Sequence, residues 1–270
     1  MNAAEAWFRD RVGEPFEFQR RSWAAQSAGE SGLLHAPTGM GKTYAAWLPS
    51  LIRWCDEHPD AAAWPDTKPE PLRVLWLTPL RALATDTEQT LKAPVEALGL
   101  PWTVERRTGD VSAAVKARQK KRLPSALVTT PESLSVLMSY VDARQKFRGL
   151  QTVIVDEWHE LMSTKRGTQT ELGLARLRRW AEEDGKSLSV WGLSATLGNL
   201  DEAMQTLLGP KADSGGGGTM IHGPDHKKVE ITTLLPDDVE RFPWAGHLGL
   251  TLLPKVLDVL ENSGSTLLFT

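Results

Sequence analysis

The chain has 270 residues, enough for one large or two ordinary domains and for a core that needs no disulfide or metal. Its composition, 41% hydrophobic and 24% charged, is typical of a globular protein and excludes disorder over most of the length. The net charge of −3 excludes nucleic-acid binding by bulk positive charge, so any such binding must come from a local arrangement of groups.

Cysteine usage and hydropathy indicate a cytoplasmic protein. Cys55 is the single cysteine, so no intramolecular disulfide can form and no cysteine cluster can hold zinc, as expected in a reducing compartment. No apolar run approaches the roughly 20 residues that a bilayer needs, and residues 1–16 contain no apolar signal segment. We therefore expect no membrane partner.

Short apolar runs alternate with segments of helical composition along most of the chain. Strands are predicted at residues 33–35, 74–77, 126–128, 153–155 and 188–191, several of them apolar on both faces. Helices are predicted at residues 43–54, 81–98, 112–122, 132–140, 170–183 and 201–208. This alternation predicts an α/β fold, with a mainly parallel sheet flanked by helices.

A glycine-rich run at residues 214–218 predicts a flexible boundary. Beyond it the sequence predicts an extended piece at 229–235, a helix near 252–260 and a strand-like run at 265–270. We therefore predict a first domain over residues 1–212, a linker over 213–250 and the start of a second domain over 251–270.

A phosphate-binding loop follows the first predicted strand and precedes a helix. Gly39 and Gly41 let backbone N–H groups turn toward phosphates, Lys42 reaches the β- and γ-phosphate oxygens, and the hydroxyl of Thr43 binds Mg²⁺. The alternative is an ordinary glycine-rich turn. It is disfavoured because both the residues of the loop and the strand and helix that flank it match a phosphate-binding loop. The predicted ATP-binding residues of the loop are Pro37, Thr38, Gly39, Met40, Gly41, Lys42 and Thr43.

Two adjacent carboxylates, Asp156 and Glu157, follow a buried strand, where α/β sheets hold their ligands. In a phosphate-transfer site Asp156 anchors Mg²⁺, and Glu157 orients and deprotonates the attacking water. An acidic strand end by itself is more often a solvated turn, but together with the phosphate loop upstream it favours a phosphate-transfer site. For His159 a plain surface position and zinc binding were weighed, and the absence of a nearby second ligand disfavours zinc.

The order of these blocks resembles the motifs of DExH-type superfamily 2 helicases. Motif I is similar to Gly39–Thr43, motif II to Asp156–His159 and motif III to Ser194–Thr196, while Ala36 replaces the first glycine of the general loop pattern. The remaining blocks are the Q-motif at Phe16–Gln19, motif Ia at Thr78–Leu83, a glycine-containing motif at Arg107–Asp110 and motif Ib at Thr130–Leu134. The wording of Asp156–Leu161 and Ser163–Gly167 resembles the Lhr (large helicase-related) group, within it most the bacterial ligase-associated DEXH-box DNA helicases.

This resemblance, which runs from Phe16 to Thr270, implies a RecA-like P-loop NTPase domain plus the start of a second one. It implies ATP and Mg²⁺ as ligands and ATP-driven translocation on single-stranded DNA, or DNA with a 3′ tail, in the 3′–5′ direction during repair. An ATP-dependent DNA ligase and a nuclease of the same pathway are the implied partners. Motifs IV–VI do not occur in the sequence, so we expect the chain alone to bind with little turnover. The alternatives are an RNA helicase motor domain and a non-catalytic ATP-binding module.

The resemblance also assigns roles to single residues. Gln19 reads adenine, and Phe16 or Phe18 packs on the base, the alternative for either aromatic being a place in the core. The hydroxyls of Ser194 and Thr196 couple the nucleotide site to the nucleic-acid face through Asp156 and His159, unless this segment only caps the helix that starts near Asn199. His159 joins Lys42, Asp156 and Glu157 in the predicted catalytic set. The predicted nucleic-acid contacts are Thr78, Pro79, Arg81, Gly109, Asp110, Thr130, Pro131 and Glu132.

Motifs Ia and Ib are predicted to place their prolines at first helical positions, where free N–H groups bind phosphate. Three further features stay open at this stage. The basic run Lys116–Arg122 is either a DNA contact or a solvated face, and the same holds for Lys165 and Arg166. Trp102 and Trp244 either stack on bases or pack in the core.

Overall fold

The structure is a computed structural model that describes residues 2–196, 198–209, 218–224, 231–235 and 252–269. The chain divides into two compact units, Met1–Asp225 and His226–Thr270, which are described separately. None of the helices in the described ranges is long and apolar enough to cross a membrane.

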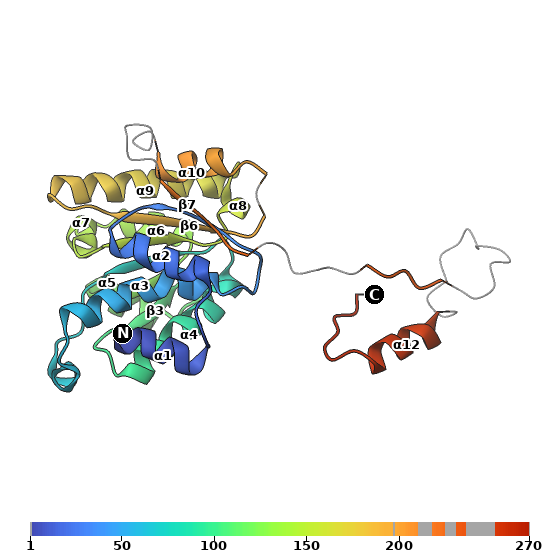
Figure 1. Ribbon diagram of the computed structural model, residues 1–270. Helices are drawn as coiled ribbons and strands as arrows, with labels where there is room; N and C mark the ends of the chain where they lie inside the picture. Colours follow the sequence, from blue (N-terminus) through green and yellow to red (C-terminus); the bar gives the residue numbers. More distant parts are fainter. Residues whose placement is uncertain (1, 197, 210–217, 225–230, 236–251, 270) are drawn as a thin grey trace. The chain divides into compact units, whose positions relative to one another are not determined.

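A seven-stranded parallel sheet forms the centre of the first unit, with the strand order β3-β4-β2-β5-β6-β1-β7 (Figure 1). Successive side chains of a strand point to opposite faces of the sheet, so Leu33 packs into the core on one face and Leu34 into the core on the other. The strands are β1 (Gly32–His35), β2 (Val74–Leu77), β3 (Val104–Arg107), β4 (Ala126–Thr129), β5 (Thr152–Val155), β6 (Ser189–Ser194) and β7 (Thr219–His222).

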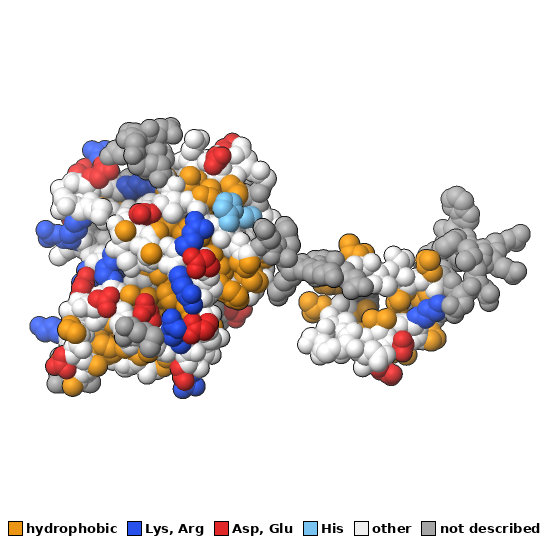
Figure 2. Space-filling view, viewed as in Figure 1, with side chains coloured by type: hydrophobic (Ala, Val, Ile, Leu, Met, Phe, Trp, Pro, Cys, Tyr) orange, Lys and Arg blue, Asp and Glu red, His pale blue; other side chains and the backbone are white. Residues whose placement is uncertain are grey.

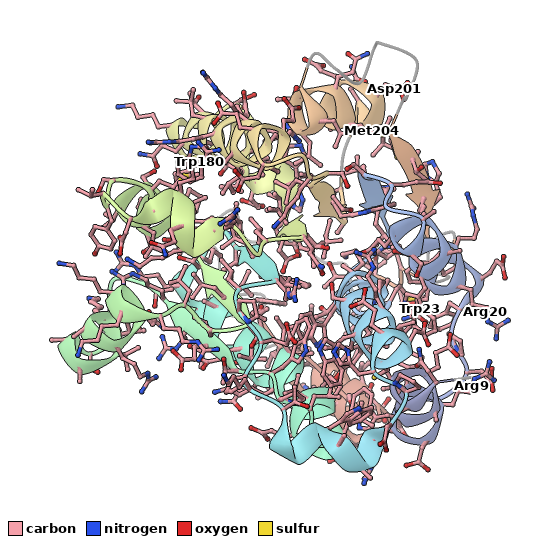
Figure 3. All side chains as sticks on the ribbon, turned by 90° about the vertical axis from the view of Figure 1, so that its left-hand side faces the viewer. Arg9, Arg20, Trp23, Trp180, Asp201 and Met204 are labelled. Carbon is pink, nitrogen blue, oxygen red and sulfur yellow. The ribbon has the colours of Figure 1, made fainter. Side chains whose placement is uncertain are left out.

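Helices cover both faces of the sheet. One layer of the core is built on α1 (Ala3–Arg11), α2 (Glu17–Ser27), α3 (Lys42–Glu57) and α4 (Arg81–Leu98), and a short 3₁₀ helix follows α3 at Ala61–Asp66. The other layer is built on α6 (Pro131–Met138), α7 (Ala143–Phe147), α8 (Trp158–Leu161), α9 (Lys165–Glu183) and α10 (Leu200–Leu208). Figure 3 labels one tryptophan of each layer, Trp23 on α2 and Trp180 on α9.

Six helices and strands of the first unit, and the short 3₁₀ helix, were not predicted from the sequence. The six are α1, α2, α7, α8 and the two strands at the edges of the sheet, β3 and β7. Strand β7 pairs in parallel with β1, from Gly32 opposite Thr219 to His35 opposite His222. It lies within the predicted linker at 213–250, so the first unit extends to Asp225, beyond the predicted end at 212.

The second unit contains one described helix, α12 (Leu253–Glu261), as predicted near 252–260. The strand-like run is different, because residues 266–269 are not in a strand. A strand needs a hydrogen-bonded neighbour, and no described residue pairs with this run. The predicted extended piece at 229–235 is described from residue 231, and residues 231–235 form no strand. Most of the predicted linker lies outside the described residues.

Candidate functional site

The predicted motifs lie at the carboxyl ends of neighbouring strands, along one edge of the sheet. The phosphate loop follows β1, Ser194 ends β6 and the acidic pair follows β5; we call these three strands the phosphate-loop half. Thr78, Gly109 and Thr130 follow β2, β3 and β4, which we call the β3 half. Because all the strands are parallel, the sheet order divides the motifs into two adjacent groups.

The phosphate loop depends on two glycines with left-handed backbones, Gly39 at φ +81° and Gly41 at φ +82°. A Cβ atom on Gly41 would lie 2.7 Å from Nε2 of Gln19, so a side chain is excluded there for two reasons. Gly41 is also the N-cap of α3 and supplies no side-chain cap. The first N–H groups of this 16-residue helix therefore remain available to an anion at the loop.

Lys42 is 8% exposed, and its ammonium group is folded back onto the loop. Nζ donates to the carbonyl oxygens of Ala36 at 2.7 Å and of Pro37 at 3.2 Å. Burial lowers the pKa of Lys42, and the nearby carboxylates of Glu157 and Asp156 oppose that shift. The ammonium group is thus held by two neutral carbonyl oxygens, beside the loop at which phosphate oxygens would bind.

Gln19 ties the Q-motif to the phosphate loop. It is 2% exposed; its Oε1 accepts the N–H of Phe16 at 2.8 Å and its Nε2 donates to the carbonyl of Gly41 at 3.1 Å. Adenine binding would replace one of these bonds, so that role stays a prediction. Phe18 is core, whereas Phe16 is half exposed and stacks on Phe18 with ring centres 5.9 Å apart.

Asp156 is held by three hydrogen bonds at the end of β5. Its N–H donates to Leu77 at 2.8 Å, its Oδ1 accepts the N–H of Glu157 at 3.0 Å, and its Oδ2 accepts the indole N–H of Trp76 at 3.3 Å. Burial, followed by the charge of Glu157, raises the pKa of Asp156 to about 6. The carboxylate is therefore oriented but poorly solvated, which favours a cation beside it.

Glu157 and His159 connect motif II to the neighbouring strand. Glu157 has a left-handed backbone, φ +46°, which is strained for a non-glycine residue. A hydrogen bond of 3.1 Å links Nδ1 of His159 to Oγ of Ser194, and the same nitrogen lies 3.4 Å from Oε2 of Glu157. This is the predicted contact between motifs II and III. Thr196, by contrast, is exposed and bonds neither Asp156 nor His159 in the described part of the chain.

The residues present fit a magnesium nucleotide. Within the described ranges no three His, Cys, Asp or Glu side chains cluster as a metal site. Mg²⁺ bound with substrate phosphates takes few protein ligands, and the hydroxyl of Thr43 and the half-buried carboxylate of Asp156 are the residues that would hold it. The first N–H groups of α3 would bind the phosphates.

In the β3 half the two prolines differ. Pro131 is the first residue of α6, and the hydroxyl of Thr130 accepts the N–H of Ser133 at 3.5 Å, as expected for a helix start. Pro79 lies before its helix, because α4 begins at Arg81, so the prediction of a first helical position is wrong there. The hydroxyl of Thr78 is buried and has no hydrogen-bond partner among the described residues.

The charged residues of the β3 half bind one another. The carboxylate of Asp110 accepts hydrogen bonds from the Thr108 hydroxyl and, at 2.8 Å, from the Arg106 guanidinium, and these hold its pKa below the usual range. Both oxygens of Glu132 accept from Arg166, one of them at 3.1 Å. Two of the predicted nucleic-acid contacts are thus carboxylates that organise neighbouring arginines.

Arg81 and Gly109 are brought together across the β3 half. A Cβ atom on Gly109 would lie 3.1 Å from Nη2 of Arg81, so the arginine lies directly over the glycine backbone. The sequence did not reveal Trp76, which bonds Asp156, as a residue of the site. It placed Arg107 in the glycine-containing motif but did not show the contacts of that arginine with Tyr140 and Gln119. Both residues are on strands whose neighbours the sequence does not show.

Known proteins resemble this chain over most of its length. The sequence model of the DEAD/DEAH box helicase family matches residues 16–203. The Lhr helicase/probable uracil glycosylase of Mycolicibacterium smegmatis is 31% identical over 282 residues, which cover 97% of this chain and 17% of that protein. The ATP-dependent helicase Lhr-Core of Methanothermobacter thermautotrophicus is 30% identical over 98% of this chain and 31% of its own length.

A solved structure agrees with these sequence relatives. The Mycobacterium smegmatis helicase Lhr bound to ssDNA and AMP-PNP matches with a TM-score of 0.73 and 30% identity, over 97% of this chain and 32% of that one. The DEAD-box helicase Mss116 bound to ssRNA and UDP-BeF, at 20% identity and a TM-score of 0.61, shares the fold. The chain thus spans about a third or less of the Lhr proteins that it matches.

Proposed function

Because the chain belongs to the DEAD/DEAH box helicase family and is related to the Lhr helicases, we propose that it is the ATP-binding motor domain of an ATP-dependent DNA helicase. The observation that carries this proposal is the convergence of Lys42, the Asp156–Glu157 pair and the Ser194–His159 bond at one edge of the sheet. Each group by itself has a structural explanation, whereas their convergence supports nucleotide hydrolysis.

The nucleotide phosphates would lie against the N–H groups of the loop and the start of α3. Lys42 would exchange its carbonyl partners for phosphate oxygens, and Thr43 and Asp156 would hold Mg²⁺, which neutralises charge that develops on the phosphates. Glu157, whose strained backbone presents its carboxylate beside this space, would orient the attacking water and accept its proton. Gln19 would fix the loop through Gly41 and, in this proposal, read adenine.

The Ser194–His159 bond joins the end of β6 to the segment after β5 within the phosphate-loop half. In this proposal it transmits the state of the nucleotide site to the nucleic-acid face. Thr196 is exposed beside this bond and is proposed to join it when nucleotide is present. Ser194→Ala should leave hydrolysis without DNA within about fivefold, since one hydrogen bond contributes about 1 kcal/mol. It should reduce the stimulation by DNA, which comparison of the two rates would measure.

Single-stranded DNA would lie across the β3 half. The unpartnered Thr78 hydroxyl, the first N–H groups of α6 behind Pro131, and the Gly109 backbone with Arg81 over it are groups suited to phosphates. Figure 2 shows cations and anions intermingled on the visible face of the first unit, without a field of one sign. Such a footprint grips the backbone locally and reads little sequence.

The assignment of a subfamily, a substrate and a direction of translocation rests on the residues of the segments Asp156–Leu161 and Ser163–Gly167. On that ground we place the chain with the ligase-associated helicases, acting in the cytoplasm on DNA with a 3′ tail, in the 3′–5′ direction. Its partners in repair would be a DNA ligase and a nuclease. Residues 251–270 would open a second RecA-like domain; α12, with Leu253, Leu257 and Val259 exposed on it, is suited to pack against further structure.

An ATPase assay with and without single-stranded DNA tests the proposal. Because little turnover is expected of the chain alone, we expect slow hydrolysis that DNA stimulates and that Lys42→Ala and Glu157→Gln abolish, with nucleotide binding retained in Glu157→Gln. Lys121→Ala, an exposed lysine on another helix, is the matched control. Nucleotide binding without hydrolysis would favour the non-catalytic module. Equal stimulation by DNA and RNA oligomers of one sequence would keep the RNA alternative.

A further inference from the structure

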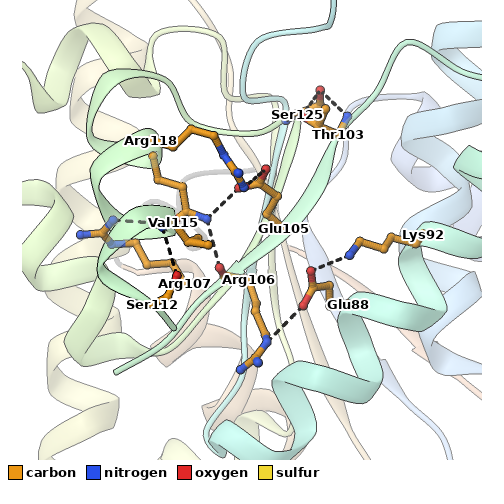
Figure 4. Close-up of polar contacts among 11 residues, drawn as sticks. Glu88, Lys92, Thr103, Glu105, Arg106, Arg107, Ser112, Val115, Arg118 and Ser125 are labelled. Atoms are coloured by element: carbon orange, nitrogen blue, oxygen red, sulfur yellow. Dashed lines mark hydrogen bonds and ion pairs between the residues drawn. The ribbon is translucent and has the colours of Figure 1, made fainter. Parts of the chain in front are cut away.

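The basic run at residues 116–122 divides into two groups. Arg118 pairs with Glu105 at 2.8 Å (Figure 4), and Arg122 donates to the backbone carbonyl of Pro69. Lys116 and Lys120 instead line a hollow between α5 (Ala113–Lys121) and α6. Arg118 is thus neutralised by a carboxylate and Arg122 is held by a carbonyl, whereas the two lysines place their ammonium groups at the hollow.

The hollow measures about 430 Å³, within the range of ligand sites. The hollow is also lined by Arg107 at the end of β3, by Gly109 in the loop after it, and by Ser133 and Tyr140 from the region of α6. No carboxylate belongs to the lining. The lining therefore carries three cations and no anion, in a chain whose net charge is −3.

Arg107 is the unusual member of this group. Its side chain is buried, at 5% exposure, yet its guanidinium donates only to neutral oxygens: the carbonyl of Lys116 at 3.3 Å, Oε1 of Gln119 at 3.5 Å and the hydroxyl of Tyr140 at 3.0 Å. No carboxylate of the described residues forms an ion pair with it. A buried charge without a counter-charge costs several kcal/mol, and an anion in the hollow would offset that cost.

The remaining cations add to the same potential. Nζ of Lys116 donates to the carbonyl of Gly109 at 2.7 Å, which keeps that ammonium beside the glycine loop. Nζ of Lys120 lies 5.5 Å from the centre of the Tyr140 ring, which holds this flexible chain near the hollow by cation–π attraction. Lys146 lies over the same ring but is paired with Asp142 and does not line the hollow.

We infer that this hollow, lined by Arg107, Lys116 and Lys120, binds a backbone phosphate of the single strand held by the β3 half. The inference rests on the proposed function, because Gly109 and the start of α6 form both the proposed strand-binding face and the rim of the hollow. A DNA strand that crosses that face brings a phosphodiester to the hollow while its neighbouring phosphates are bound at the other sites of the face. A free phosphate would be bound by the hollow alone. The site extends the footprint beyond the recognised motifs onto α5.

Binding of a labelled oligodeoxynucleotide to the whole chain, followed by fluorescence anisotropy over a salt series, tests this inference. The double variant Lys116→Gln/Lys120→Gln should bind about tenfold more weakly. The slope of log K against log salt should fall by about 1.4, two cations at about 0.7 each for single strands. Lys121→Gln, on the same helix but outside the hollow, should change neither quantity. Melting temperatures of both variants control for folding.

The outcomes separate the inference from the proposed function. If the unaltered chain binds the oligomer and the double variant matches Lys121→Gln, the inference is wrong and the proposed function stands. If the unaltered chain binds no oligomer, both fail. A third arm adds inorganic phosphate at constant ionic strength: a phosphate-induced rise in melting temperature that the double variant loses while keeping its DNA affinity would assign the hollow to a free anion and overturn the inference.

Discussion

The two halves of the sheet edge hold their polar groups in different ways. In the phosphate-loop half, Lys42 and Gln19 are buried and Asp156 is half-buried. Lys42 binds carbonyls of its own loop, while Gln19 on α2 binds Gly41 and Trp76 on β2 binds Asp156. In the β3 half, Asp110 and Glu132 are more exposed, and each forms an ion pair with an arginine. Chemistry on a phosphate needs groups fixed before the substrate arrives, whereas a grip on a flexible strand needs only donors within reach.

The largest effect is expected in the phosphate-loop half, from substitution of Trp76. Trp76→Phe removes the indole N–H that Oδ2 of Asp156 accepts, and loss of a group that orients a metal ligand typically costs about 10–100-fold in metal affinity. The Mg²⁺ concentration needed for nucleotide binding should rise accordingly, as measured by titration. Nucleotide binding without Mg²⁺ should remain unchanged.

Trp47→Phe is the matched control for that variant. Trp47 is equally buried, but its indole N–H donates to the carbonyl of Leu91 at 3.1 Å, away from the acidic pair. Both variants should lose similar stability, and only Trp76→Phe should alter the Mg²⁺ dependence. Equal titrations for the two would show that Asp156 is oriented without Trp76.

The pH dependence of folding should distinguish the two halves next. Because the pKa of Asp156 is about 6 in the folded chain, above its ordinary value of 3.8, the folded state holds this proton more tightly than the unfolded state. The free energy of unfolding should therefore fall as the pH rises from about 4 to about 6, by at most about 3 kcal/mol, and then stay level for this group.

Denaturant unfolding between pH 4 and pH 7 measures this contribution. Asp156→Asn should flatten the decline between pH 4 and pH 6. Asp110→Asn tests the opposite sign in the β3 half, because the pKa of Asp110 is lowered in the folded chain. Its stabilisation is present above the unfolded pKa and is lost as the pH falls. An unaltered decline in Asp156→Asn would assign the pH dependence to other groups.

The smallest effect is expected from Glu132→Gln. The variant breaks an exposed ion pair worth about 0–1 kcal/mol, so the free energy of unfolding should change by less than that. It also frees Arg166 and removes a negative charge from the strand-binding face, so affinity for single-stranded DNA should rise about two- to threefold. Glu171→Gln, which neutralises a carboxylate elsewhere on α9, is the control; an equal rise there would indicate a general charge effect.

The sequence predicted the elements whose patterns are strong by themselves. Strands such as 74–77 and 153–155 are apolar on both faces because helices cover both faces of the sheet. The glycines and the lysine of the phosphate loop reveal its turn and the start of its helix. The edges of the sheet were missed. β3, with Glu105 and Arg106 on it, and β7 beside the glycine run lack that apolar signature, because an edge strand is covered less completely.

The amino-acid sequence by itself determined the α/β architecture, the order of the motifs and the chemical groups that each contributes. Only the tertiary structure decided which groups meet: Gln19 with Gly41, Trp76 with Asp156, Ser194 with His159, and Arg107 with the hollow beside α5. The reason is physical. Local composition fixes a strand or a turn, whereas the order of strands in a sheet depends on crossovers that bring distant segments side by side, and no local pattern records that order.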